Sequence, residues 1–260
     1  MKTCFFKIIA GAAFFTLMLG AASPSRAGEV TVAVATNFLN PLKQLAAGFQ
    51  KEKGHRVRIV SGSTGKLYAQ IIHGAPFDVF LAADGERPRL LADHHPPVAR
   101  AETRFTYAVG RLALWSADPQ TLSGNGPEIL RAKRFNHLAL ANPDTAPYGR
   151  AARSVIERLK LKEALAPLIV QGENIGQAFQ FTATGNAEIG FVALSQLMDP
   201  RMKIQGSRWV VPEDLHDPIE QDAILLSRGT TNPAARAFMD YLISPPARTL
   251  IQSYGYGLKP

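Results

Sequence analysis

The octapeptide VSGSTGKL (residues 60–67) is the most informative segment of the chain, because it joins a predicted strand to a predicted helix. An apolar run precedes it, and an amphipathic segment follows as far as His73. Glycine and small hydroxyl residues let a backbone approach a ligand closely. The first N–H groups of a helix lack partners and carry the positive end of its dipole. With the hydroxyls of Ser63 and Thr64, this turn could therefore cradle an oxyanion, although an ordinary helix cap explains the turn equally well when it is taken alone.

Short β-rich runs alternate with helical patterns along most of the chain, which is typical of parallel sheets covered by helices. Strands are predicted at 30–35, 56–60, 78–82, 105–109, 112–116, 137–141, 168–170, 188–192, 209–211 and 219–226. Closing helices are predicted at 233–243 and 245–254, and a loop at 119–127. Pro41 suits the first position of the helix that follows the first strand.

Four predicted strand-to-helix turns carry hydroxyl, amide or glycine groups, and two of them fall in each half of the chain. Ligands of open α/β sheets bind at the carboxyl ends of the strands, where such turns lie. A ligand held between two lobes by helix N-termini of both explains the pattern most simply. The four turns contain Thr36 and Asn37, Ser63 and Thr64, Tyr148 and Gly149, and Asn174 and Ile175.

At these turns the sequence resembles the periplasmic molybdate-binding proteins of ABC importers, over almost all of the chain after residue 28. The matching stretches are VTVAVATNF (30–38), SGSTGKLYAQIIHGAPFDVFLAAD (61–84), NPDTAPYGRAA (142–152), ENIGQAFQF (173–181), EIGFVALSQ (188–196) and SYGYGL (253–258). The resemblance implies an α/β, two-lobed periplasmic binding protein of type II, in which each lobe is a mixed, mostly parallel sheet flanked by helices. We expect lobe 1 to comprise residues 28–107 plus 222–260, and lobe 2 residues 108–221.

The same resemblance implies a ligand shell of neutral hydrogen-bond donors. It assigns the side chains of Thr36, Asn37, Ser63 and Thr64, and the backbone N–H groups of Tyr148 and Ile175. Many relatives place a tyrosine hydroxyl in the site from a position that is Ala193 here. In one subtype of the family an asparagine amide replaces that donor, and Asn37 fits this pattern.

The chemistry of the ligand agrees with this shell. Molybdate carries no proton near neutral pH, so all its oxygens accept hydrogen bonds, whereas phosphate carries a proton and needs an acceptor in its site. Tungstate and sulfate are unprotonated tetrahedral dianions too, so a binder of another such oxyanion remains the alternative. The resemblance further implies delivery of the ligand to the membrane permease of the importer, by a protein that we expect to be a monomer without a cofactor.

The first 27 residues have the features of a secretory signal peptide. Lys2 and Lys7 precede an apolar segment of residues 8–20, and Ser25-Arg26-Ala27 forms a small-x-small cleavage site. The apolar segment is short for a membrane span. We therefore expect cleavage after Ala27 and a periplasmic protein. The only cysteine, Cys4, would be removed with the signal, so no disulfide is expected.

Loss of Lys2, Lys7 and Arg26 lowers the formal net charge from +8 to +5. The remaining basic residues are spread along the chain without a block interleaved with aromatics, which argues against nucleic-acid binding.

Enzymatic and metal-binding functions have weaker support in the sequence. A triad of Ser63, His73 and Asp78 is conceivable, but His73 precedes a helix-ending glycine, where a cation suits the helix dipole. The six histidines show no metal-ligand spacing. Tyr254 and Tyr256 resemble the paired tyrosines of ferric-ion binders, but their Tyr-Gly-Tyr-Gly context favours packing of the C-terminus onto lobe 1. We therefore expect neither a catalyst nor a metal-ion site.

Overall fold

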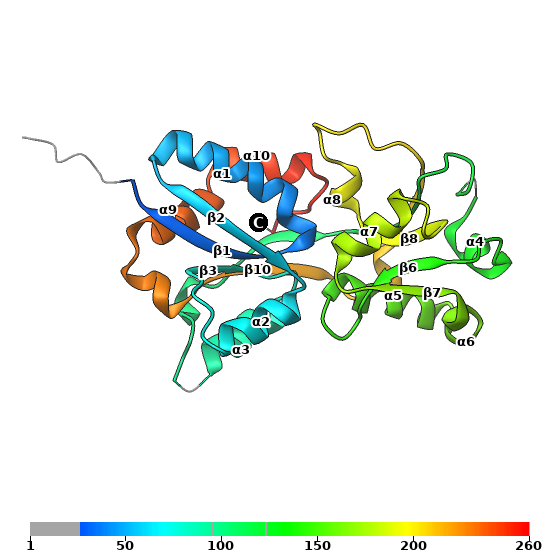
Figure 1. Ribbon diagram of the computed structural model, residues 1–260, viewed down its shortest axis with the longest axis horizontal. Coiled ribbons are helices and arrows are strands. Elements are labelled where there is room, and N and C mark those ends of the chain that lie inside the picture. Colours follow the sequence, from blue (N-terminus) through cyan, green and yellow to red (C-terminus); the bar gives the residue numbers. More distant parts are fainter. Residues whose placement is uncertain (1–26, 95, 123, 260) are drawn as a thin grey trace, which may run out of the picture.

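Two lobes lie side by side in the computed structural model, which describes residues 27–94, 96–122 and 124–259 (Figure 1). Each lobe is built on one five-stranded sheet with helices around it. The predicted two-lobed α/β architecture is therefore confirmed. The predicted signal peptide, residues 1–27, lies outside the described residues except for Ala27.

The sheet of lobe 1 has four strands that run in one direction and one that runs against them. β1 pairs in parallel with β2 and β3, whereas β10 is antiparallel to both of its neighbours, β3 and β4. In sheet order the strands are β2 (Arg56–Gly62), β1 (Glu29–Ala35), β3 (Val79–Leu81), β10 (Ile219–Leu225) and β4 (Phe105–Gly110). The helices are η1 (Thr36–Phe38), α1 (Leu39–Lys53), α2 (Thr64–Ile72), α3 (Glu86–Asp93), η2 (Ala101–Thr103), η5 (Ser227–Thr231), α9 (Pro233–Leu242) and α10 (Pro245–Ser253).

The sheet of lobe 2 repeats this arrangement. β6 is parallel to β7 and β8, and β5 is antiparallel to β8 and β9, so β5 alone runs against the rest. In sheet order the strands are β7 (Ile169–Gly172), β6 (Leu138–Ala141), β8 (Ile189–Ala193), β5 (Leu112–Ser116) and β9 (Ser207–Val210). The helices are α4 (Gly126–Ala132), α5 (Pro147–Arg158), α6 (Lys162–Leu165), η3 (Ala166–Leu168), α7 (Ile175–Ala183), α8 (Leu194–Leu197) and η4 (Glu213–Leu215).

Helices cover both faces of the first sheet, which explains why its inner strands β1 and β3 are continuous apolar runs. Successive side chains of a strand point to opposite faces. Val30, Val32 and Val34 of β1 accordingly pack with α1, α9 and α10, whereas Ala33 packs with α2 and α3 on the other face (Figure 1). Tyr254 and Tyr256 are buried in the core beneath α1, as the interpretation of the C-terminal tail predicted.

The chain crosses between the sheets twice. β4 ends at Gly110 and β5 begins at Leu112, so the first crossing is centred on Arg111. The second lies between the end of β9 and Ile219, where β10 begins. β4 and β10 pair with each other along residues 105–110 and 219–223. The two crossings therefore sit together at the ends of one antiparallel pair. Both lie a few residues inside the range 108–221 that was expected for lobe 2.

Two helix starts differ from the sequence prediction. α1 begins at Leu39 after a single 3₁₀ turn, so Pro41 is its third residue rather than its first. This is tolerated because the first four N–H groups of a helix have no intrahelical partner. The expected loop at 119–127 ends in α4, whose second residue is Pro127. Proline in the first turn of a helix was mistaken for part of a loop.

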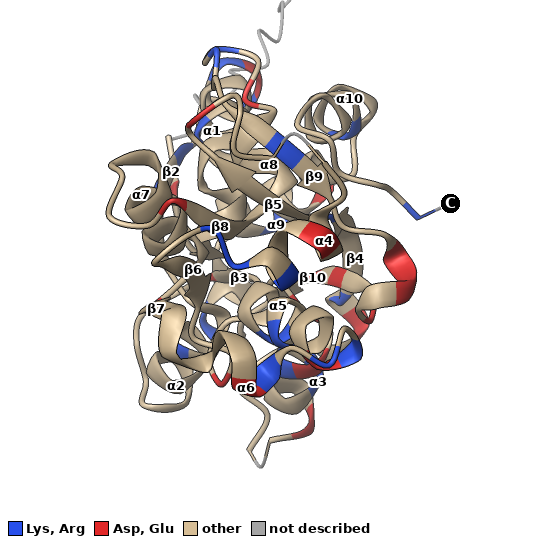
Figure 2. Cartoon of the chain, turned by 90° about the vertical axis from the view of Figure 1, so that its right-hand side faces the viewer, with Lys and Arg blue, Asp and Glu red and all other residues tan. Residues whose placement is uncertain are grey.

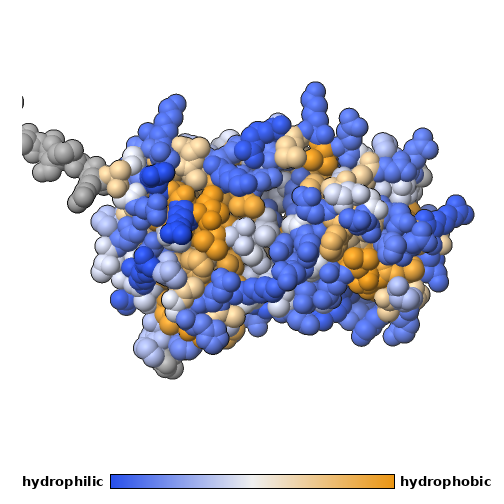
Figure 3. Space-filling view, in the orientation of Figure 1, coloured by the Kyte–Doolittle hydropathy of each residue, from blue (hydrophilic) through white to orange (hydrophobic). Residues whose placement is uncertain are grey.

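In the view of Figure 2 basic and acidic residues are mixed rather than segregated. Figure 2 shows Lys and Arg interspersed with Asp and Glu around α3, α5 and α6. In the view of Figure 3 each lobe carries an apolar patch, and mainly neutral to hydrophilic residues lie between the two patches. Within the described ranges no helix is both long and apolar enough to cross a membrane.

Candidate ligand-binding site

The four predicted turns meet at the boundary between the lobes, where they enclose a small cavity of about 10 Å³. All six predicted site residues line it, three turns contributing helix N-termini and one the start of η1. A polar cavity needs about this volume to hold the centre of a single water molecule. The lining residues are Ala35, Thr36, Asn37, Gly62, Ser63, Thr64, Ala83, Ala146, Pro147, Tyr148, Asn174 and Ile175.

Ser63 is the N-cap residue of α2, yet its side chain makes no capping hydrogen bond. Its Oγ is buried and has no hydrogen-bond partner among the described residues. An unsatisfied buried polar atom costs about 1–3 kcal/mol, so native structures retain few of them. An ordinary capping role, the alternative left open by the sequence, therefore does not explain Ser63.

Thr64 and Gly65 connect the first turn of α2 to neighbouring segments. The Thr64 hydroxyl oxygen accepts a hydrogen bond from the Ala83 N–H at 3.0 Å, which leaves its own proton free to donate. The Gly65 N–H donates to the Thr145 carbonyl oxygen of lobe 2 at 2.8 Å. A Cβ at Gly65 would lie 3.0 Å from backbone atoms of Thr145. Glycine here thus permits close contact between the lobes, rather than between the backbone and a ligand.

Lobe 2 contributes two helix N-termini to the cavity. α5 begins at Pro147, so Tyr148 lies in its first turn, and α7 begins at Ile175. The Asn174 side chain caps α7 by accepting a hydrogen bond from the Gln177 N–H at 3.1 Å. The N–H groups of Tyr148 and Ile175 belong to the set that helices leave without internal partners. The resemblance implied backbone donors at these two positions, and that assignment stays a prediction.

Asn37 has a different hydrogen-bonding arrangement from the expected one. Its amide nitrogen, expected to face a ligand, donates to Gln221 Oε1 at 2.8 Å and to the Tyr256 hydroxyl at 3.0 Å. Its Oδ1 is buried without a partner in the described structure. Thr36, in contrast, is only half-buried, at the start of η1 beside the cavity.

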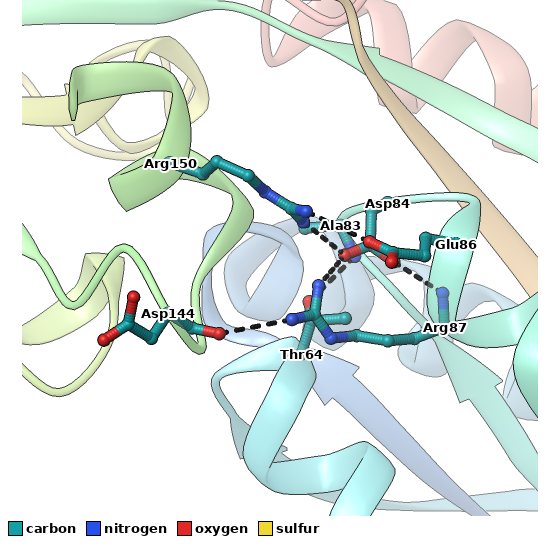
Figure 4. A network of polar contacts seen from close by, with 7 residues as sticks. All are labelled: Thr64, Ala83, Asp84, Glu86, Arg87, Asp144 and Arg150. Carbon is teal, nitrogen blue, oxygen red and sulfur yellow. Dashed lines mark hydrogen bonds and ion pairs between the residues drawn. The ribbon is translucent and has the colours of Figure 1, made fainter. Parts of the chain in front are cut away.

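No lining residue of the cavity carries a charge. The nearest charged side chains pair with one another beside it, as Figure 4 shows. Arg150 of α5 reaches from lobe 2 to Asp84 at 3.2 Å and to Glu86 at 3.0 Å, while Arg87 of lobe 1 contacts Asp84 and donates to the Asp144 carbonyl oxygen at 3.3 Å. The hydrogen bond from Arg150 lowers the pKa of Glu86 below its usual value of 4.5. These pairs hold the lobes together without placing a charge in the cavity.

Asp144 and Glu173 lie near two of the turns but do not line the cavity. The Glu173 carboxylate pairs with Lys66 across the lobe boundary at 2.9 Å, and Asp144 pairs with Arg153 at 3.4 Å. Ala193, where many relatives have tyrosine, is fully buried at the end of β8. The cavity is thus bounded by hydroxyl, amide and backbone groups.

Sequence reasoning missed a set of polar side chains that lies behind the cavity and contacts Asn37 and Tyr148. The Ser195 hydroxyl donates to the Asn37 carbonyl oxygen at 3.1 Å, and the carboxamide of Gln221 joins Asn37, Tyr107 and Tyr148. These residues come from β4, α5, α8 and β10. No local pattern marks them, because they belong to segments far apart in the sequence.

Residues 30–257 match the family described as bacterial extracellular solute-binding protein, and the chain belongs to this family. The Molybdate-binding protein ModA of Azotobacter vinelandii is 51% identical over 238 residues, which cover 92% of this chain and 93% of the relative. That of Rhodobacter capsulatus is 46% identical over 247 residues, which cover 95% of each chain.

The solved structure of the Azotobacter vinelandii periplasmic molybdate-binding protein has the same fold. It superposes with a TM-score of 0.83 at 41% sequence identity, and the match covers 89% of this chain and 100% of that one. The resemblance identified from the sequence is therefore confirmed.

The family and the named relatives are binding proteins, which confirms the prediction that the chain is not an enzyme. His73 of the conceivable triad is the C-cap residue of α2, at the helix end opposite Ser63. The described residues contain no group of three or more His, Cys, Asp or Glu side chains placed to hold a metal ion.

Proposed function

We propose that this protein binds molybdate in the cavity between its lobes and delivers it to the membrane permease of an ABC importer. Tungstate, a dianion of the same shape and charge, would enter the same site. The proposal rests on the family of the chain, on its relatives named molybdate-binding proteins, and on the composition of the cavity.

The observation that carries the proposal is a cavity formed by helix N-termini and hydroxyl groups with no charged side chain in its lining. A tetrahedral dianion without a proton needs donors on all sides and no acceptor. α2, α5 and α7 direct the positive ends of their dipoles towards the cavity, which favours an anion. Hydrogen bonds to a charged group contribute about 1.5–3 kcal/mol each. Several of them would support tight binding after the costs of desolvation and ordering.

Within this proposal the six predicted site residues have distinct roles. The hydroxyls of Thr36, Ser63 and Thr64 and the amide of Asn37 donate from lobe 1, and the N–H groups of Tyr148 and Ile175 donate from lobe 2. The unpaired Ser63 Oγ is the strongest support for the role of a side chain, because a ligand would satisfy a group that the fold leaves without a partner.

The proposal includes the state and the location of the protein. We infer a periplasmic monomer that is exported by the signal peptide of residues 1–27 and begins at Gly28 after cleavage. No cofactor takes part, since molybdate is the cargo. The two crossings between the lobes, at Arg111 and between β9 and β10, would act as the hinge.

Calorimetric titration of the purified protein with molybdate, tungstate, sulfate and phosphate tests this function. We expect one molybdate or tungstate per chain, much weaker binding of sulfate, and no binding of phosphate near neutral pH. Binding of sulfate as tightly as molybdate would contradict the molybdate assignment. Delivery is tested separately by molybdate uptake in cells that lack the gene, which should fall and be restored by the intact chain.

A further inference from the structure

The carboxamide of Gln221 lies at the centre of a buried hydrogen-bond network behind the cavity. Gln221 is fully buried on β10, next to the register shift between Gln221 and Asp222. Its Oε1 accepts hydrogen bonds from Asn37 Nδ2 at 2.8 Å and from the Tyr107 hydroxyl at 3.1 Å. Its Nε2 donates to the Tyr148 hydroxyl at 3.2 Å. One side chain on a strand of lobe 1 thus contacts a cavity residue of each lobe.

In this arrangement the Asn37 side chain has the wrong polarity for an oxyanion. Both protons of Nδ2 are used, by Gln221 and by Tyr256, and Oδ1 is the atom left without a partner. A buried acceptor without a donor is costly by itself. Next to a dianion whose oxygens also accept, the cost would be greater, because the charges repel in a desolvated site.

The same contacts permit a second arrangement in which both carboxamides exchange oxygen and nitrogen. The nitrogen of Gln221 then donates to Asn37 Oδ1 and to Tyr107, and its oxygen accepts from the Tyr148 hydroxyl. The Tyr256 hydroxyl donates at 2.9 Å to the backbone carbonyl oxygen of Asn37, which also accepts a hydrogen bond from the Ser195 hydroxyl. Because Ser195 still satisfies that oxygen, Tyr256 can donate to Asn37 Oδ1 instead.

This second arrangement keeps a partner for each of these polar groups and frees the amide nitrogen of Asn37 for the cavity. Tyr107 remains satisfied as well, since it donates to the Ala82 carbonyl oxygen at 3.1 Å. The arrangement suits a cavity that holds an acceptor-only ligand.

We propose that Gln221 is a positioning residue that turns the Asn37 side chain, so that its amide nitrogen rather than its oxygen meets the bound oxyanion. The proposal rests on the oxyanion-binding function of the cavity. It makes Gln221 a determinant of specificity. Only a side chain that can both donate and accept a hydrogen bond can pair with either end of the Asn37 carboxamide. With Asn37 Oδ1 held towards Gln221, the site rejects an oxyanion that carries a proton. With Oδ1 towards the cavity, the site would accept one.

The groups that surround Gln221 do not titrate near neutral pH. Burial raises the pKa of Tyr107, Tyr148 and Tyr256 above the usual value of 10, so all three hydroxyls stay protonated. The two carboxylates whose charges act on Tyr107, Asp222 and Asp84, are paired with arginines. Binding of molybdate by the natural protein should therefore vary little between pH 6 and 9.

The Gln221→Glu substitution gives the first test, because ionised glutamate can only accept. An ionised carboxylate at this position would accept a hydrogen bond from the Asn37 amide nitrogen and leave Asn37 Oδ1 towards the cavity. A protonated carboxyl can instead donate to Asn37 Oδ1, as the glutamine does. The affinity of the variant for molybdate, measured by calorimetry, should fall by about 10-fold or more as pH rises from 6 to 9. Its matched control is Gln44→Glu, since Gln44 donates to the Tyr254 hydroxyl at 2.8 Å in lobe 1, and its pH profile should stay flat.

A double-mutant cycle of Gln221→Met with Asn37→Ala gives the second test. If Gln221 acts through Asn37, Gln221→Met should weaken molybdate binding by about 10-fold or more in the natural background and by much less in the Asn37→Ala background. The cycle needs folded variants, which melting curves and far-ultraviolet circular dichroism verify. If Gln221→Met does not fold, the Gln221→Glu profile decides.

The outcomes separate this inference from the function on which it rests. Equal losses in the two backgrounds, or a flat pH profile for a folded Gln221→Glu variant, would overturn the positioning role while leaving molybdate binding intact. Failure of the natural protein to bind molybdate would instead overturn the proposed function.

Discussion

Ser63 and Ser244 both have a buried hydroxyl oxygen without a hydrogen-bond partner in the described residues, but only Ser63 lines the cavity. In Ser63→Ala the unsatisfied group disappears, so the free energy of unfolding of the ligand-free protein should rise, by about 1 kcal/mol. Molybdate affinity should fall about 10-fold or more, since a charge-assisted donor is lost.

Ser244→Ala is the matched control for this prediction. It should raise the melting temperature similarly and leave the affinity unchanged. Thermal melts and calorimetry measure both quantities. A Ser63→Ala protein that binds molybdate as the natural protein does would remove Ser63 from the ligand shell.

Asn37 connects the cavity to the network behind it, so its loss should affect binding and stability together. Asn37→Ala should weaken molybdate binding about 10- to 150-fold, since it removes one charge-assisted donor. The ligand-free protein should also melt earlier, because Gln221 and Tyr256 lose a buried partner.

Asn37→Asp should bind molybdate far more weakly than Asn37→Ala, because it places a carboxylate against a dianion. Asn186→Ala, in an exposed turn, serves as the control with no expected effect on affinity. Equal affinities of the Ala and Asp variants would show that this side chain does not face the anion.

At the scale of the element, α5 depends on Gly149 for its distance from β6. A Cβ at this position would lie 2.2 Å from the Ala141 carbonyl oxygen, a backbone atom that cannot move aside. Alanine usually stabilises a helix by about 1 kcal/mol relative to glycine. Here Gly149→Ala should instead destabilise the fold by about 1–3 kcal/mol and weaken molybdate binding, because the first turn of α5 must shift. Unchanged melting and affinity would contradict this close-packing argument.

Elements with strong local signals were predicted well from the sequence. β5 has the predicted bounds. The first strand and the two closing helices each differ from the prediction by one residue at one end, because their apolar patterns are clear. α4 was missed because it begins at Gly126-Pro127, a pair that resembles a turn. The turns that line the cavity were identified because each carries its own hydroxyl, amide or glycine signal.

The network around Gln221 could not be predicted in the same way. Its members Tyr107, Gln221 and Tyr256 lie on separate segments, and nothing in the residues next to them in the sequence indicates a polar role. Their proximity results from the pairing of β4 with β10 and from the return of the C-terminal tail onto lobe 1. Contacts of this kind depend on the tertiary fold, which local patterns do not encode.

For the whole molecule, the contacts between the lobes predict how tightly the closed form is held. Arg150 pairs with Asp84 and Glu86 of the opposite lobe, whereas Arg153 on the same helix pairs only with Asp144 of its own lobe. Arg150→Gln should speed molybdate dissociation about 2- to 10-fold, as expected for partly exposed ion pairs, and Arg153→Gln should not. Stopped-flow release measures both rates, and equal rates for the two variants would exclude a closing role for Arg150.

The Arg150 contacts also make the stability of the closed form depend on pH. The Arg150 hydrogen bond lowers the pKa of Glu86 in the closed form. This pair therefore stabilises closure above pH 4.5, and its contribution is lost as the pH falls through the lowered pKa.

A ligand that touches both lobes favours the closed form, because it binds that form more tightly than the open one. Small-angle scattering should therefore show a smaller radius of gyration with molybdate than without it.

The central claim is that one oxyanion is held between the lobes by neutral donors of both. Anomalous diffraction from a crystal of the protein grown with molybdate tests it most directly, because molybdenum is located independently of the protein atoms. We expect one anomalous peak per chain, inside the cavity, with oxygens within hydrogen-bond distance of Ser63 Oγ and of the Tyr148 and Ile175 N–H groups. A peak beside the Asp84 and Arg150 side chains instead, with the cavity empty of molybdenum, would contradict the account.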